Sequence, residues 1–98
     1  MKKAIFYSLM FTGGKKQAVL QQGWTDGTYN YYKSQRGGTW YAVHPLYGLS
    51  VATGDTRSEA AIRAHDKSIT EAIQNSSQTW RASLMSDFVK LRIEAKTA

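Results

Sequence analysis

The chain has 98 residues, no cysteine, 13 lysines and arginines against 7 acidic residues, and a formal net charge of +6. This length suits one domain over residues 1–98, and the lack of cysteine excludes a disulfide scaffold and thiolate metal sites. The charge is uneven, because residues 1–54 hold six basic residues against Asp26 alone, whereas residues 55–98 hold seven against six. The first part also holds ten of the twelve aromatic residues, so the two parts are expected to differ in role.

The amino terminus imitates a secretory signal, with two lysines followed by an apolar run over residues 4–11. A stretch rich in glycine and lysine follows at once, and no small-residue cleavage site is present. No apolar run approaches the roughly 20 residues of a membrane span. The sequence therefore predicts neither a signal peptide nor a membrane partner, and we expect a cytoplasmic location.

Turns that contain glycine recur through the first half of the chain, at residues 13–14, 26–27, 37–38 and 47–48. Their spacing of about 10 to 13 positions is typical of strands linked by hairpins. The candidate strands are residues 4–11, 17–24, 28–34, 39–44 and 49–53. We therefore expect an α+β fold, in which an antiparallel β-meander of about five strands fills residues 1–54 and helices fill residues 55–98.

The first candidate strand is apolar at nearly every position from Ile5 to Phe11. A strand at the surface of a sheet should instead alternate between apolar and polar residues. The pattern therefore predicts a strand that is central in the sheet, or one that is covered on both faces.

The pairing of the third and fourth strands decides which tyrosines share a face. A three-residue loop pairs Lys33 with Tyr41 and Tyr31 with Val43, whereas a two-residue loop turns Lys33 inward. We expect the first register, because burial of an unpaired lysine is costly. The outer face of the sheet would then present Tyr29, Tyr31, Lys33 and Tyr41.

Residues 39–60 read as a strand, a turn, a second strand and a capped helix. Trp40 and Ala42 are expected to share a face with Val51, and this face should meet the helices. The sequence Thr-Arg-Ser-Glu from Thr56 to Glu59 is a capping box, which predicts a helix that starts at Thr56.

One apolar seam runs through the helical part, and two structures fit it. Its members are Ile62, Ile69, Ile73, Trp80, Leu84, Phe88 and Leu91. A single helix over residues 56–95 would be about 60 Å long at about 1.5 Å per residue, and its free end would need a partner, such as a second copy in a homodimer. Alternatively, the Asn-Ser-Ser sequence at 75–77 breaks it into two helices that both lie on the sheet, which usual helix lengths favour.

Neither histidine comes with a pattern that supports catalysis or metal binding. No H-E-x-x-H motif, carboxylate cluster or thiol accompanies His44 or His65, so we interpret them as a strand-end and a helix-boundary residue. The sequence Gly-Gly-Lys-Lys at 13–16 lacks the frame of a phosphate-binding loop and predicts an exposed basic turn. We therefore expect a protein that is not an enzyme and needs no metal or cofactor.

The basic and aromatic sheet is the feature that points to a function. Nucleic acid is bound by cations that meet its phosphates and by flat side chains that stack on unpaired bases. The candidate binding residues are Tyr29, Tyr31, Lys33, Arg36 and Tyr41, with Lys15 and Lys16 on a neighbouring turn. Nucleic acid, either DNA or RNA, is therefore the first expected partner. Tyrosine, tryptophan and arginine also anchor protein interfaces, so the alternative is a small modulator or inhibitor of another protein.

The segment from Trp40 to Ala60, with its two strands, Gly48, Gly54 and capping box, resembles the amino-terminal arm-type DNA-binding domains of phage integrases. Those domains insert a three-stranded sheet into DNA, so the resemblance implies a DNA partner. The size and style of the chain are also similar to those of small accessory and inhibitor proteins of bacteriophages, which act on host protein complexes. The first likeness rests on hairpin and capping residues that many folds share, the second rests on size and style alone, and neither assigns a family.

Overall fold

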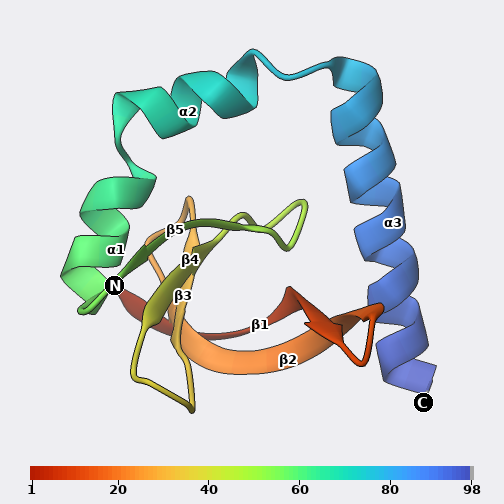
Figure 1. Cartoon of the computed structure of the whole chain (residues 1–98), viewed down its shortest axis with the longest axis horizontal. Coiled ribbons are helices and arrows are strands. Elements are labelled where there is room, and N and C mark those ends of the chain that lie inside the picture. Colours follow the sequence, from red (N-terminus) through yellow and green to blue (C-terminus); the bar gives the residue numbers. More distant parts are fainter. Residues whose placement is uncertain (98) are drawn as a thin grey trace.

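The computed structural model describes residues 1–97, which form a five-stranded antiparallel sheet followed by three helices (Figure 1). The strands lie in sequence order: β1 (Lys2–Thr12), β2 (Lys15–Thr25), β3 (Asn30–Lys33), β4 (Trp40–Val43) and β5 (Ser50–Gly54). The helices are α1 (Arg57–Ala64), α2 (Lys67–Gln74) and α3 (Gln78–Thr97). The predicted α+β class, with a meander and carboxyl-terminal helices, is confirmed.

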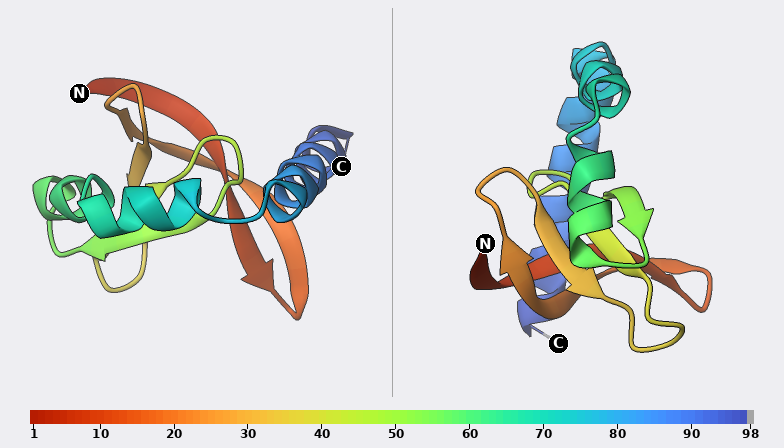
Figure 2. Two further views of the ribbon diagram at one scale, coloured as in Figure 1. Left: turned by 90° about the horizontal axis from the view of Figure 1, so that it is seen from above. Right: turned by 90° about the vertical axis from the view of Figure 1, so that its left-hand side faces the viewer.

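The sheet consists of a long ribbon and a short three-stranded part. β1 and β2 pair over 11 residues each, whereas β2 meets β3 only through Trp24 opposite Tyr31 and Thr25 opposite Asn30. A side chain at position 23 would collide with the Tyr31 carbonyl, so Gly23 allows the backbones to approach closely. Beyond this point the ribbon bends away from β3 and sweeps across the short strands (Figures 1 and 2).

The prediction that the first strand is central or covered is wrong. β1 is an edge strand that, within residues 1–97, pairs with β2 alone, and the side chains of Ile5 and Phe11 are 68% and 70% exposed. The helices cover other parts of the sheet, because α1 packs on β3, β4 and β5 while α3 packs on β2. Apolar composition alone therefore failed to place this strand.

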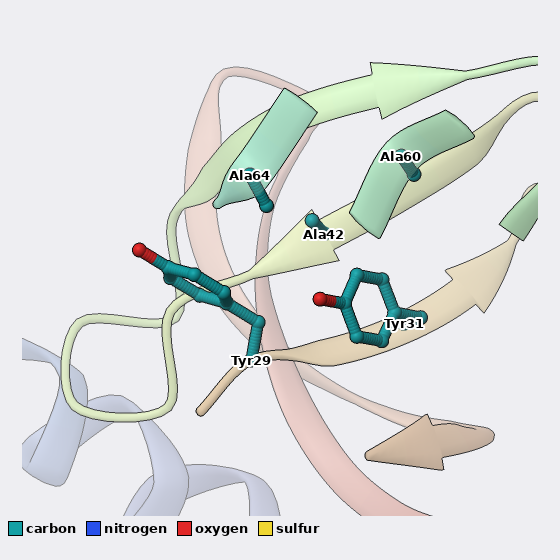
Figure 3. Close-up of a cluster of buried hydrophobic side chains, with 5 residues drawn as sticks. All are labelled: Tyr29, Tyr31, Ala42, Ala60 and Ala64. Carbon is teal, nitrogen blue, oxygen red and sulfur yellow. The ribbon is translucent and has the colours of Figure 1, made fainter. Parts of the chain in front are cut away.

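α1 starts where the capping box predicts. The Thr56 side chain accepts a hydrogen bond from the Glu59 amide at 3.1 Å, and the helix then places Ala60 and Ala64 against Ala42. Figure 3 shows these alanines above the sheet. The prediction that the Ala42 side of β4 meets the helices is confirmed, and small side chains on both elements let α1 lie close to the strands.

The predicted break at 75–77 is confirmed, and the single long helix is wrong. Asn75 ends α2, and the Ser77 hydroxyl accepts a hydrogen bond from the Trp80 amide near the start of α3. A second break was not predicted, although His65 was interpreted as a helix-boundary residue. His65 ends α1, and Asp66 caps α2 by accepting a hydrogen bond from the Ser68 amide at 2.9 Å. The premise for a dimer through the free end of one helix therefore does not hold.

The apolar seam does not form one buried stripe. Phe88 is buried, but Ile62 and Trp80 are 74% and 54% exposed. α2 stands away from the sheet, arches from α1 to α3 and buries no residue, so only α1 and α3 lie on the sheet (Figure 1). The apolar residues keep their helical spacing across both breaks, so this spacing gave no sign of the break at His65 and Asp66.

Phe88 of α3 packs on the loop between β4 and β5. Gly48 has a φ of +70° there, and a side chain at this position would overlap the Phe88 ring. The Gly48 carbonyl also accepts a hydrogen bond from the Leu9 amide of β1 at 2.9 Å. Three distant segments thus meet at one glycine.

Candidate functional site

A groove of about 370 Å³ separates the β1–β2 ribbon from the hairpin of β3 and β4. The ribbon contributes Met10, Val19, Leu20 and Gln21, and the hairpin contributes Tyr32, Lys33, Ser34, Gln35, Arg36 and Tyr41. We call this feature the β3–β4 groove. It lies where the ribbon leaves β3, because the short pairing of β2 with β3 leaves the rest of β2 separate from the hairpin.

The aromatic wall of the groove is a pair of stacked tyrosines. Tyr32 and Tyr41 face each other across β3 and β4, with ring centroids 5.3 Å apart and an interplanar angle of 17°. Tyr32 is buried and also meets Phe6 at 6.2 Å, whereas Tyr41 is partly exposed. Burial raises the pKa of Tyr32, so its hydroxyl is neutral at physiological pH. Tyr41 is thus a rigidly backed ring that faces solvent.

Two cations stand at the hairpin end of this wall. Lys33 and Arg36 are exposed, and within residues 1–97 neither takes part in an ion pair. Two hydrogen bonds from Ser34 order the loop that carries Arg36. The Ser34 amide donates to the Thr39 carbonyl at 2.8 Å, and the Ser34 hydroxyl donates to the Arg36 carbonyl at 2.6 Å. Since no acidic side chain lines the groove, its local charge is positive.

The basic turn between β1 and β2 splits its two lysines between opposite faces. Lys15 pairs with Thr12 and, by strand alternation, shares the face of Val19, which lies about 13 Å further along β2 at about 3.3 Å per residue. Lys16 points to the other face, where its ammonium lies 5.8 Å from the Phe11 ring. The structure therefore places Lys15 on the groove side of the sheet and Lys16 on the far side.

The predicted register of β3 and β4 is wrong. Lys33 pairs with Trp40, Tyr32 with Tyr41 and Tyr31 with Ala42, so Tyr31 and Tyr41 lie on opposite faces. This is the register that the rejected two-residue loop would give, although the strands themselves end at Lys33 and Trp40. The cost assigned to an inward lysine did not apply, because Lys33 ends its strand and stays exposed whichever face it formally occupies.

Tyr29 and Tyr31 consequently belong to the core and not to the outer face. Both are buried, at 3% and 0% exposure, beneath Ala60 and Ala64 of α1 (Figure 3). Of the seven residues predicted for binding, the structure brings Lys33, Arg36 and Tyr41 together in one groove. It adds Tyr32, which the sequence reasoning missed; the alternative register was the only signal that pointed to it.

A hydrogen-bonded network fixes the buried tyrosines to the end of α1. One carboxylate oxygen of Asp26, Oδ2, lies 2.5 Å from the Tyr31 hydroxyl, which donates to it, and 2.7 Å from Nε2 of His65. The other oxygen accepts from the amides of Thr28 and Tyr29. Burial opposes the charge, but these hydrogen bonds outweigh it and hold the pKa of Asp26 well below its usual value. Asp26, the single acidic residue of residues 1–54, is therefore hydrogen-bonded on the face that α1 covers and does not line the β3–β4 groove.

His44 directly follows the last residue of β4, in agreement with its predicted place at a strand end, and has aromatic neighbours. Its ring stacks on Tyr47 at 4.4 Å and meets the edge of Tyr29 at 5.9 Å. Burial lowers the pKa of His44, and Nδ1 accepts a hydrogen bond from the Leu46 amide at 3.2 Å. These contacts give the residue a role in ordering the turn. Among residues 1–97, no three His, Cys, Asp or Glu side chains are grouped to hold a metal ion.

No protein-family model, curated protein or solved structure matches the chain. Within the part of the chain that the structure describes, no helix is long and apolar enough to cross a membrane.

Proposed function

We propose that the protein binds single-stranded nucleic acid in the β3–β4 groove. The observation that carries this proposal is the partly exposed Tyr41 ring, backed by Tyr32 and flanked by Lys33 and Arg36. A base stacks on the Tyr41 ring, while the adjacent phosphates meet the two cations. The chain acts by binding alone, without a metal or cofactor, and we place it in the cytoplasm.

A single strand fits this arrangement better than a duplex. The bases of a duplex are stacked on one another and offer only their edges, whereas an unpaired base offers its whole face. Tyr41 lines the groove beside two cations, so we expect its partner to be an unpaired base. Lys15, further along the same face of the ribbon, extends the positive path for the phosphate backbone.

The proposal is tested by fluorescence anisotropy with labelled single-stranded and duplex oligonucleotides, DNA and RNA, over a range of salt concentrations. We expect affinity for single strands to fall steeply with salt, and Lys33→Glu or Arg36→Glu to weaken binding across sequences. Loss of one phosphate contact should make the negative slope of log K against log salt shallower by about 0.7. Lys16→Glu is the matched control, because it makes the same charge change on the far face.

The contribution of stacking is tested at the same site. Tyr41→Ala should lose about 1 to 3 kcal/mol of binding free energy for one stacked base, a loss of roughly fivefold to 150-fold in affinity. Tyr41→Phe keeps the ring and should bind nearly as well as the parent. Absent or salt-insensitive binding, or equal losses from Lys16→Glu and Lys33→Glu, would refute the proposal.

The second candidate function is binding to another protein as a modulator or inhibitor, in the manner of small phage accessory proteins. Its support is apolar exposure on the helices, where Val89 and Ile93 of α3 are 43% and 56% exposed. A tagged copy should then retain one stoichiometric protein partner from lysate after nuclease digestion. Loss of every partner on digestion would count against this function and favour the first.

A further inference from the structure

The amino-terminal half of β1 is an open sheet edge. β2 occupies one side of the strand, and on the other side the Leu9 amide donates to the Gly48 carbonyl. Figure 2 shows this half of β1 at the rim of the molecule, on the side away from α1 and β5. Among residues 1–97, no other strand pairs with the edge before Leu9.

Strand geometry identifies which backbone groups point outward. The turn at Gly13–Gly14 makes Thr12 and Lys15 the closing pair of a two-residue hairpin, which exchanges hydrogen bonds between the strands. Every second residue of β1, counted back from Thr12, points its N–H and C=O groups toward β2. The alternate residues point these groups toward the outer edge. Leu9 obeys this rule, so Lys3, Ile5 and Tyr7 present the free groups.

The side chains beside this edge are apolar and accessible. Ile5 is 68% exposed, and it borders a surface trough that Lys3, Gln22 and Trp24 also line. Single-domain proteins usually protect such an edge, since its unpaired groups are a template for another strand. Here the visible protection is the lysine pair at residues 2–3.

We propose that β1 pairs with β1 of a second copy, antiparallel and centred on Ile5, to join two sheets across a twofold axis. In this register Ile5 faces Ile5 of the other copy, and Lys3 faces Tyr7 on both sides of the axis. Each of these three outward-facing pairs exchanges two N–H···O bonds. The contact is isologous, so it closes as a dimer.

Charge selects this register over its neighbours. A shift that centres the pairing on Lys3 would set two lysines directly opposite each other, which is destabilising. A shift toward Leu9 would compete with the hydrogen bond that its amide already makes to Gly48. Centring on Ile5 instead puts Lys3 between Trp24 of its own β2 and Tyr7 of the second copy, where aromatic rings flank a cation.

Self-association does not depend on nucleic acid, and it responds to salt in the opposite direction. Each copy carries a net charge of +6, so added salt should strengthen the dimer by screening repulsion. Where the proposed function also holds, the twofold axis sets both β3–β4 grooves on one side of the joined sheet. The dimer and the nucleic-acid complex can therefore be tested separately, and either proposal can fail while the other holds.

The first experiment uses the natural absence of cysteine. Facing residues of a hydrogen-bonded antiparallel pair have Cα atoms about 5.5 Å apart, within the range of about 4.4 to 6.8 Å that a disulfide spans. Ile5→Cys should therefore form a covalent dimer under mild oxidation. Phe11→Cys, equally exposed on the same face of β1 but outside the paired segment, should remain monomeric. Equal cross-linking of both variants, or of neither, would overturn the inference.

The second experiment measures association of the cysteine-free chain by sedimentation equilibrium at low and high salt. Ile5→Pro removes an outward N–H that β2 does not use, so the ribbon should fold while dimerisation weakens by about tenfold to thirtyfold. Ile5→Thr keeps that N–H and is the control, and circular dichroism verifies that both fold. A chain that is monomeric at both salt concentrations would show that no such dimer forms. A dimer that survives Ile5→Pro but dissociates with Val89→Asp would place the interface on α3 instead of β1.

Discussion

The two faces of β3 and β4 carry tyrosines in opposite surroundings. On the helix side, Tyr31 is fully buried under α1 and donates to Asp26. On the groove side, Tyr41 is partly exposed beside two cations and no acidic residue. Tyr31 and Tyr32 are adjacent in sequence, yet strand alternation sends them to different faces. A tyrosine-rich strand therefore says little about function until its covered face is known.

The largest expected effect is a difference in the free energy of unfolding between substitutions on the two faces. Tyr31→Ala should lower the free energy of unfolding by about 3 to 5 kcal/mol, because it empties a core site and removes the bond to Asp26. Tyr41→Ala should cost about 1 kcal/mol, the value of an aromatic pair at the surface. Urea denaturation of both variants measures the contrast. Equal losses would mean that Tyr41 is also a core residue.

The charge of Asp26 gives the helix side a dependence on pH. Its pKa is lowered on folding, so its contribution to stability is complete above the unfolded pKa of about 4 and is lost as the pH falls below it. At pH 7, Asp26→Asn should cost about 1 to 3 kcal/mol, since charged hydrogen bonds are lost. Unfolding midpoints at pH 7 and pH 2.5 should show a smaller difference between parent and variant at the lower pH. A constant difference would contradict the network.

The smallest effect concerns the helix that closes the covered face. Thr56→Ala removes the cap of α1 and should destabilise the protein by about 1 kcal/mol, whereas Thr56→Ser keeps the hydroxyl and should be nearly neutral. Thermal melts resolve this difference. Neither substitution should change oligonucleotide affinity, because the cap lies on the helix side. A parallel loss of affinity would show that the two faces are coupled.

Local chemistry made much of the fold predictable. The glycine turns marked the strands, Thr56 and Glu59 marked the start of α1, and residues 75–77 marked a helix break. The missed break at Asp66 also had a local signal. This aspartate lies two residues before Ser68 and accepts a hydrogen bond from the Ser68 amide, as residues that cap helices do. The apolar seam holds no information about such a polar cap.

The predictions that were wrong concern contacts between segments that lie far apart in the sequence. The Asp26–His65 contact joins residues 39 positions apart, and its choice of partner has no trace in local sequence. The register of β3 and β4 depended on a loop length that turn residues did not determine. The exposure of Ile5 depended on where the helices lie. These are matters of tertiary packing, which overrides strand propensity.

The junction at Gly48 has a consequence for the order of folding. Its two partners, Leu9 and Phe88, lie about 40 positions away in opposite directions along the chain, so both contacts close long loops at an entropic cost. The hairpins and α1 involve near neighbours in sequence and form without that cost. We therefore expect the hydrogen bond between Leu9 and Gly48 and the docking of Phe88 from α3 to form late, after the hairpins and α1.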